Sequence, residues 1–313
     1  MKHRLHTLAA ALALACPCIG FAYDEPTVNL GATSFLDGAP PAGPGLYFTA
    51  YGQYYSANHL KDNSGNDLPL PKQEVQVSDL LAQLTYMAPT SVFGASPGVQ
   101  FLLPWVIDAH TDDGLNGAAL KGNPGVGDLE IGPFLQFAPV MGAQGPKFVQ
   151  RVEFTFIVPT GRYQNTAAVN PGSNFWSFNP YWAGTYWFTP KLTASWRLHY
   201  LWNAKNDQPS PAFGSGITNT QAGQAVHTNL TVDYGITPQL RAGLNSYWLL
   251  QFTDTDANGQ AVHGRKERVL ALGPGAIYSF SRDDHLFVNV YFEEGARNRP
   301  EGDRVQLRWV HHF

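Results

Sequence analysis

Apolar and polar residues alternate along much of the chain, and this period of two is typical of β-strands whose two faces meet different surroundings. In the stretch 192–203, Leu192, Ala194 and Trp196 begin an apolar face, whereas Arg197 and His199 belong to the polar one. The same alternation recurs after residue 45 and predicts an all-β chain. Its twelve predicted strands lie near 46–55, 75–86, 98–107, 128–137, 148–158, 177–188, 192–203, 225–234, 240–251, 267–280, 286–293 and 304–313.

The gaps between these strands alternate between long and short. Gaps after odd-numbered strands have 10 to 21 residues, and the others have 3 to 11. This rhythm is typical of outer-membrane barrels, which have long extracellular loops and short periplasmic turns. We therefore predict a transmembrane antiparallel up-and-down β-barrel of about twelve strands, with both chain termini on the periplasmic side.

Four strands depart from the simple pattern. The strand at 98–107 is more continuously apolar than the rest, and the strand at 75–86 changes phase near Ser78 and Asp79, which suggests a β-bulge. Pro180 and Pro274 interrupt two other strands, where local bends are expected.

The first 22 residues have the features of a secretory signal peptide. Basic residues precede an apolar stretch at 8–15, and small residues flank a cleavage position after Ala22. Processing as a lipoprotein before Cys16 is the alternative, disfavoured because Ala13 stands where an aliphatic residue is preferred. Export through a cleaved signal peptide predicts the outer membrane of a Gram-negative bacterium as the location.

The composition excludes several kinds of binding site and partner. Both cysteines lie within the first 22 residues, so the mature chain has no disulfide, thiolate metal site or cysteine nucleophile. Only 14% of residues are charged, and the mature chain has 18 basic against 24 acidic residues. A nucleic-acid partner, which needs a basic face, is not expected.

Residues 23–44 are rich in proline and glycine, with four of each between Pro26 and Gly45. They therefore cannot form a regular strand, and the barrel is expected to occupy 45–313. A twelve-stranded barrel encloses a narrow passage. The segment 23–44 is thus a candidate lumen plug, and a loose periplasmic lead-in is the alternative.

The end of the chain resembles the assembly signal that the barrel-insertion machinery reads. Phe313 ends a strand whose apolar face includes Val305, Leu307 and Trp309. Aromatic residues near strand ends on the apolar faces are expected to form girdles at the lipid interface. They are Trp182, Trp196, Tyr200, Trp202, Tyr234, Trp248 and Trp309.

If the apolar faces meet lipid, the polar faces line the lumen. Many of these residues are expected to pair with one another across strands, because an unpaired buried charge is costly. Together, however, arginines and aromatic rings suit a small polar aromatic solute. The candidates for a solute path are Arg151, Glu153, Arg197, His199, His227, Asp233, Arg241, Tyr247, Tyr291, Glu293, Arg304 and Arg308, and we expect Arg197 and Arg241 to converge on one part of the wall.

The sequence contains no convincing catalytic or metal-binding motif. The run from Asp254 to Gly259 begins like a calcium loop, but its twelfth position is Arg265 where a bidentate glutamate is required. The histidines match no hydrolase motif, and there is no Gly-x-Ser-x-Gly elbow. We predict no enzyme activity, no cofactor and no metal.

Four segments resemble outer-membrane proteins of the meta-pathway phenol-degradation family. The segments are Asn29–Tyr47, Gly125–Phe134, Phe154–Tyr163 and Asn174–Tyr181. Members of that family are described as transporters associated with the catabolism of aromatic compounds. The resemblance implies uptake of a phenolic or hydrophobic compound, and it carries over no binding residues.

The sequence thus predicts a porin-like channel or transporter for small aromatic or hydrophobic compounds. Its expected partners are outer-membrane lipid, the barrel-insertion machinery and a small hydrophobic or aromatic solute. Three alternatives stay open: a fatty-acid-transporter-like channel, a barrel hydrolase and a structural barrel. The first should have fourteen strands and its own plug domain, the second a Ser-His pair facing lipid, and the third longer loops or a narrower barrel.

Overall fold

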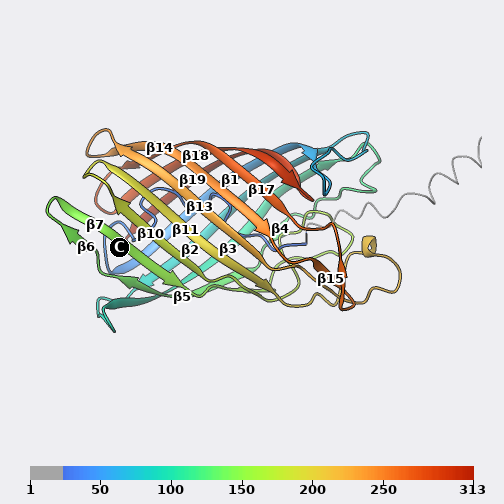
Figure 1. The fold of residues 1–313 in the computed structure, drawn as a ribbon, viewed down its shortest axis with the longest axis horizontal. Helices are drawn as coiled ribbons and strands as arrows, with labels where there is room; N and C mark the ends of the chain where they lie inside the picture. The colour runs from blue at the N-terminus through green and yellow to red at the C-terminus, as the bar shows by residue number, and fades with distance from the viewer. Residues whose placement is uncertain (1–23) are drawn as a thin grey trace, which may run out of the picture.

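The computed structural model describes residues 24–313, which form a closed antiparallel β-barrel (Figure 1). Twelve passes of the chain make up the wall, and all twelve predicted strands are present. The predicted signal peptide, residues 1–22, lies outside the described residues.

Nine passes are single strands and three are divided in two. The single strands are β1 (Gly45–Leu60), β2 (Glu74–Met87), β3 (Ala95–Asp112), β11 (Leu192–Asn203), β13 (Ala225–Gly235), β14 (Leu240–Gln251), β17 (Arg268–Ser279), β18 (Asp284–Arg297) and β19 (Pro300–His312). The divided passes are β4 (Gly125–Val126) with β5 (Leu129–Phe137), β7 (Gly145–Glu153) with β8 (Phe156–Val158), and β9 (Ser177–Phe178) with β10 (Tyr181–Trp187).

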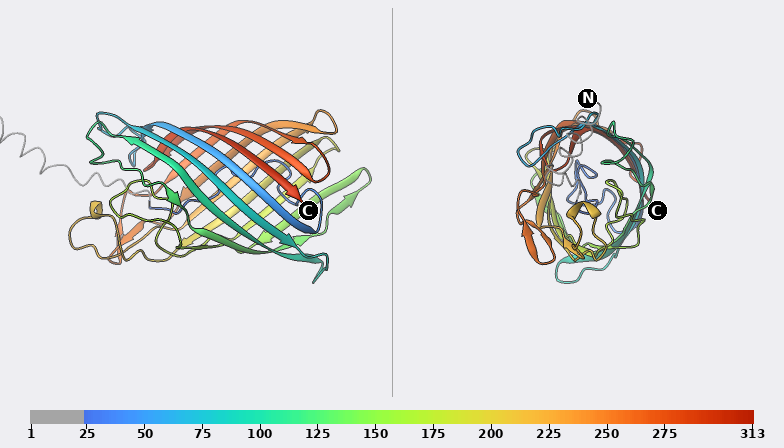
Figure 2. Two further views of the ribbon diagram at one scale, coloured as in Figure 1. Left: turned by 180° about the vertical axis from the view of Figure 1, so that it is seen from behind. Right: turned by 90° about the vertical axis from the view of Figure 1, so that its right-hand side faces the viewer.

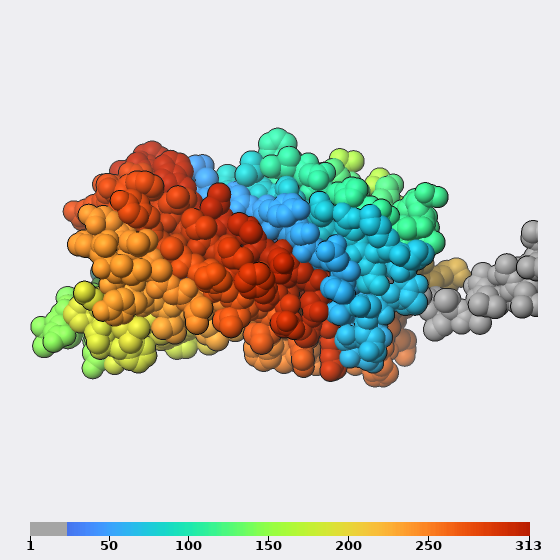
Figure 3. All heavy atoms as spheres, turned by 90° about the horizontal axis from the view of Figure 1, so that it is seen from above, coloured from blue at the N-terminus to red at the C-terminus, as the bar shows by residue number. Residues whose placement is uncertain are grey.

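Each pass pairs with the next, and β19 closes the barrel on β1 in a ladder from Tyr47 opposite His312 to Leu60 opposite Pro300. Figure 3 shows this closure from outside, with the last strands in red against the first in blue. We call the end with the connections at 188–191, 236–239 and 280–283 the short-turn end, and the opposite end the long-loop end.

Short accessory strands extend both ends. At the short-turn end, β6 (Val140–Gly142) forms a hairpin with β7. In the loops of the long-loop end, β12 (Thr220–Gln221), β15 (Thr255–Ala257) and β16 (Gln260–Val262) form a small sheet, and Pro211–Phe213 is a 3-10 turn. Between residues 24 and 313, no helix is long and apolar enough to cross a membrane.

The alternation read from the sequence separates the two faces of the wall. Along β11 and β13 most of the buried side chains are polar, as at Arg197 and Asn229, while Leu198 and Leu230 are exposed. Six of the seven aromatic residues predicted on the outer face, Trp182, Tyr200, Trp202, Tyr234, Trp248 and Trp309, are between 37% and 50% exposed. The seventh, Trp196, is half-buried because its ring packs against Trp182 and Phe148. Such a face suits hydrocarbon, since the strands satisfy their backbone hydrogen bonds by pairing with one another.

The irregularities in the sequence have different structural causes. Pro180 separates β9 from β10, as predicted. The register between β2 and β3 shifts between Ser78 and Asp79, but the extra residue is Ile107 on β3. β2 keeps its phase throughout, because its apolar Val77 faces the barrel interior rather than lipid.

Candidate functional site

Residues 24–44, which we call the N-terminal segment, run through the barrel interior (Figure 2). Its backbone amides donate hydrogen bonds to side chains of the wall: Gly31 N to Asn229 Oδ1 at 3.0 Å and Gly38 N to Thr185 Oγ1 at 2.9 Å. Phe35 is only 1% exposed. The N-terminal segment has no regular secondary structure in which its backbone groups could pair. The polar inner face of the barrel supplies hydrogen-bond partners for them instead.

The direction of this segment contradicts the prediction that both termini lie at the same end. Asp24 lies at the long-loop end, where Arg265 Nη2 is 3.0 Å from its Oδ1. The segment then descends to the short-turn end, where β1 begins at Gly45 and Phe313 ends the chain. The loop lengths correctly predicted the end of the barrel at which β1 starts. They could not predict that the residues before β1 reach it through the lumen from the opposite end.

An ion pair and a hydrogen bond hold the segment at two levels. Arg197 donates two hydrogen bonds to Asp37, at 2.6 and 2.7 Å, and its guanidinium lies 4.1 Å from the centre of the Tyr181 ring. Both members of this pair are about nine-tenths buried. At the long-loop end, Glu25 accepts a hydrogen bond from Asn203 at 2.7 Å.

Glu25 and Glu267 are neighbouring carboxyl groups at that mouth. Glu267 accepts hydrogen bonds from the backbone amides of Asp24 and Glu25. Burial raises the pKa of Glu267 to about 7, with Arg299 opposing this rise and Asp24 adding to it. Burial, together with the charge of Glu267, also raises the pKa of Glu25. When the segment is docked at this end, the protonated forms of the Glu25 and Glu267 carboxyl groups are therefore favoured.

All twelve residues predicted to line the lumen do face the interior, but most are bound to the wall or to the N-terminal segment. Glu153 accepts a hydrogen bond from Tyr181 at 2.6 Å, and Glu293 accepts one from Tyr247 at 2.6 Å. Tyr291 donates to the carbonyl of Gly31 at 3.0 Å. These contacts build the packing around the segment.

The remaining arginines stack on rings of the wall. Arg151 lies 4.1 Å from the centre of Phe134, and Arg308 lies 3.7 Å from that of Phe287. Arg304 donates a hydrogen bond to the carbonyl of Leu30 at 3.1 Å. Guanidinium groups placed on aromatic faces are stabilised by the ring quadrupole, and here the same rings also fill the barrel.

The structure does not bring Arg197 and Arg241 together. Arg197 stands opposite Asn229 and Arg241 opposite Gly235, so they lie six positions, or roughly 20 Å, apart along β13. Arg241 pairs with the fully buried Asp233 at the short-turn end. The predicted patch is therefore two separate sites, because alternation fixes which face a residue occupies and not its level along the barrel.

His199 and His227 do meet. Their rings are stacked with centres 4.0 Å apart and an angle of 14° between their planes. Both side chains are buried, and His227 Nε2 lies 3.1 Å from Asn179 Oδ1. Within the described residues, no cluster of three His, Cys, Asp or Glu side chains could hold a metal ion.

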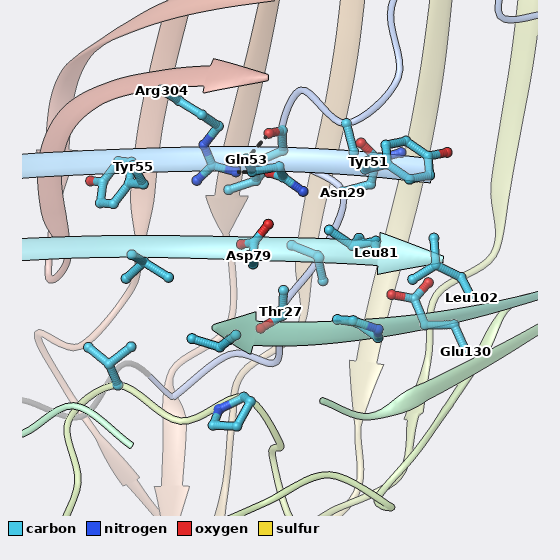
Figure 4. A pocket seen from close by; sticks show the side chains of 18 of the residues that line it. Thr27, Asn29, Tyr51, Gln53, Tyr55, Asp79, Leu81, Leu102, Glu130 and Arg304 are labelled. Carbon is cyan, nitrogen blue, oxygen red and sulfur yellow. Dashed lines mark hydrogen bonds between the residues drawn. The ribbon is translucent and has the colours of Figure 1, made fainter. Parts of the chain in front are cut away.

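A cavity of about 210 Å³ remains between the N-terminal segment and the wall formed by β1, β2 and β3 (Figure 4). One side of it is apolar, and its residues are Val75, Val77, Leu81, Leu102, Pro104 and Val106. Polar side chains interrupt the lining at Gln53, Tyr55, Asp79, Glu130 and Arg304. Loop residues of the long-loop end, at 168–171 and 298–300, also line it, so the cavity reaches that mouth.

The inward apolar residues of β2 and β3 were missed as site residues, although the sequence carried their signal. The strand at 98–107 is apolar on both faces because Leu102 and Pro104 face the cavity while Leu103 and Trp105 face outward. Toward the short-turn end the lumen is filled by Phe35, which packs in a cluster with Tyr47, Ile277, Phe287 and Val310.

Comparisons with known proteins agree with this architecture. Residues 57–309 match the family described as "Putative MetA-pathway of phenol degradation". An outer membrane channel from Pseudomonas putida F1 has a similar fold, with a TM-score of 0.75 and 18% identity over 92% of this chain and 100% of that one.

More distant barrels include the NanC porin, with a TM-score of 0.45 and 10% identity over 85% of this chain and 98% of that one. A deletion mutant of TodX, a monoaromatic hydrocarbon channel, has a TM-score of 0.43 and 9% identity over 91% of this chain and 97% of that one. No curated protein sequence matches the chain.

Proposed function

Since the chain belongs to the MetA-pathway phenol-degradation family, we propose that it is an outer-membrane channel through which small aromatic or hydrophobic compounds are taken up. The observation that carries this proposal is the cavity inside the barrel, whose walls on β2 and β3 are apolar. An apolar lining gives water little to bind and favours apolar solutes.

The size of the cavity agrees with a solute of one ring. A dry apolar cavity of about 150 Å³ is large enough to bind benzene. The cavity here is about 210 Å³, and it is bounded on one side by residues 27–33 of the N-terminal segment. A movement of that segment would change both the size of the cavity and its connection to the short-turn end.

The N-terminal segment acts in this proposal as a plug. Phe35 and its neighbours fill the lumen below the cavity, and Asp37 ties this region to Arg197. Solute would bind from the long-loop end, which faces the cell exterior if the loop rhythm gives the orientation. Release to the periplasmic side then requires the lower part of the segment to shift.

Uptake of radiolabelled phenol by cells tests the proposal. Cells that carry the protein should take up the compound faster than cells without it. Val77→Trp should lower the initial uptake rate, because the indole ring of the tryptophan would fill part of the cavity from β2. Leu80→Trp is the matched control, because Leu80 lies on the same strand and is exposed on the outer face. Equal rates with and without the wild-type protein would refute the proposal.

A further inference from the structure

Two carboxyl groups face the cavity without a partner. In the described part of the chain, neither Asp79 nor Glu130 receives a hydrogen bond or takes part in an ion pair, and both line the cavity. Asp79 Oδ1 is fully buried. A buried acceptor that lacks a donor is unfavourable, so these two positions stand out from the paired acids elsewhere in the lumen.

Two arginines beside the cavity are held by other groups of the protein. Arg197 is held by Asp37, and Arg304 donates to the Leu30 carbonyl and to Gln53 Oε1 at 3.1 and 3.4 Å. Arg304 also lies over the Tyr55 ring, 5.2 Å from its centre. In contrast to these guanidinium groups, the Asp79 and Glu130 carboxyl groups have no hydrogen-bond partner in the described part of the chain.

These acceptors adjoin the apolar wall. Asp79 and Leu81 are successive inward residues of β2, and Glu130 stands opposite Leu102 in the ladder between β5 and β3. Figure 4 shows the Leu81 side chain between the two carboxyl groups. A small solute seated against Leu81 and Leu102 would thus have a carboxyl group beside its apolar body.

We propose that this cavity selects one-ring solutes that carry a hydrogen-bond donor, a hydroxyl or an amine, which Asp79 or Glu130 accepts. This inference rests on the proposed function and names the solute class for the same cavity. A hydrocarbon of the same size leaves the carboxyl groups unpaired, and an aromatic carboxylate likewise has no hydrogen-bond donor to offer them. Sites built around a hydrogen bond reject analogues that lack the matching group.

Equilibrium dialysis of the purified full-length protein in lipid nanodiscs measures this preference. The probes are radiolabelled phenol, aniline, toluene and benzoate, which share one ring and differ in the polar group. We expect the wild type to bind phenol and aniline at least tenfold more tightly than toluene, and benzoate more weakly than phenol.

Substitutions assign the preference to the two residues. The double variant Asp79→Leu with Glu130→Leu should bind phenol and toluene with affinities within threefold of each other. Asp108→Leu is the matched control, because Asp108 is an exposed aspartate on β3 outside the cavity lining, and it should keep the wild-type preference.

Heat-modifiable migration reports whether each variant is folded. If the leucine variant does not fold, Asp79→Asn with Glu130→Gln takes its place, since amide oxygens accept more weakly than carboxylates and the phenol preference should fall severalfold. An unchanged preference in the folded double variant would overturn the inference. So would equal binding of phenol and toluene by the wild type, a result that leaves the proposed uptake intact, whereas absence of uptake of every probe refutes both.

Discussion

The ion pair between Asp37 and Arg197 should control how often the N-terminal segment leaves the lumen. Asp37→Asn removes the charge and keeps the shape of the side chain. Arg197 would then be a buried cation without its bidentate partner, since both side chains of the pair are only 9% exposed. Breaking a buried pair from one side costs about 3–5 kcal/mol. The lower value corresponds to an increase of roughly 100-fold in the undocked fraction.

A thiol probe on the segment measures that fraction. Residues 24–313 contain no cysteine, and Ser34 is a suitable position because it is 1% exposed and close in size to cysteine. In Ser34→Cys protein, a small charged methanethiosulfonate reagent should react at a rate proportional to the undocked population. Adding Asp37→Asn should raise this rate about 100-fold.

Two controls separate the ion pair from a general loss of stability. Asp67→Asn breaks a pair in which Lys61 Nζ lies 2.8 Å from a carboxylate that is 46% exposed, and the labelling rate should change less than about fivefold. Asp37→Asn combined with Arg197→Gln should label more slowly than Asp37→Asn alone, because no unpaired cation remains. Labelling of the Asp37→Asn protein at the wild-type rate would refute the reasoning.

Four further predictions concern orientation, assembly, stability and pH. A cysteine in the 204–224 loop should react with an impermeant reagent on whole cells, and one in the 189–191 turn should not; the reverse pattern would invert the proposed orientation. Deleting Phe313, which is exposed on the outer face, should lower the heat-modifiable folded fraction, and an unchanged yield would remove its proposed role in insertion. Arg241→Gln leaves a fully buried aspartate unpaired, so the melting temperature should fall while ion selectivity in planar bilayers stays at the wild-type value; altered selectivity at unchanged stability would contradict this assignment. Because the pKa of Glu267 is raised to about 7, segment docking at the long-loop end is strongest at low pH and weakens as pH rises from about 5 to 7; labelling of a cysteine placed at residue 27 should increase over that range, and a pH-independent rate in this protein would count against the assignment.

The wall was predictable from sequence because each strand meets two different solvents. Along β11, for example, the apolar Leu198 is exposed on the outer face, and its polar neighbours Arg197 and His199 are buried on the inner face. Register is not encoded in that alternation. Arg197 and Arg241 were therefore assigned correctly to the inner face and wrongly to a common level along the barrel.

The contents of the lumen were less predictable. The N-terminal segment has no periodicity, and its key contact joins Asp37 to a residue 160 positions away. On β2, Val77 is an apolar residue on the inner face because it lines the cavity. In the sequence, this made the alternation of apolar and polar residues look as if it changed phase. An apolar residue on an inner face is informative only when the strand register is known independently.

The way the N-terminal segment is hydrogen-bonded has a consequence for electrical recordings. The amides of Gly31 and Gly38 each have a specific acceptor on the wall, seven residues apart. At Gly31 the backbone has a φ of +82°, and a Cβ atom would lie 2.7 Å from the Tyr291 ring. A displacement by one residue would break both hydrogen bonds and press a side chain into that ring, so intermediate positions are unfavourable. Current through a single molecule should therefore step between discrete levels instead of drifting continuously.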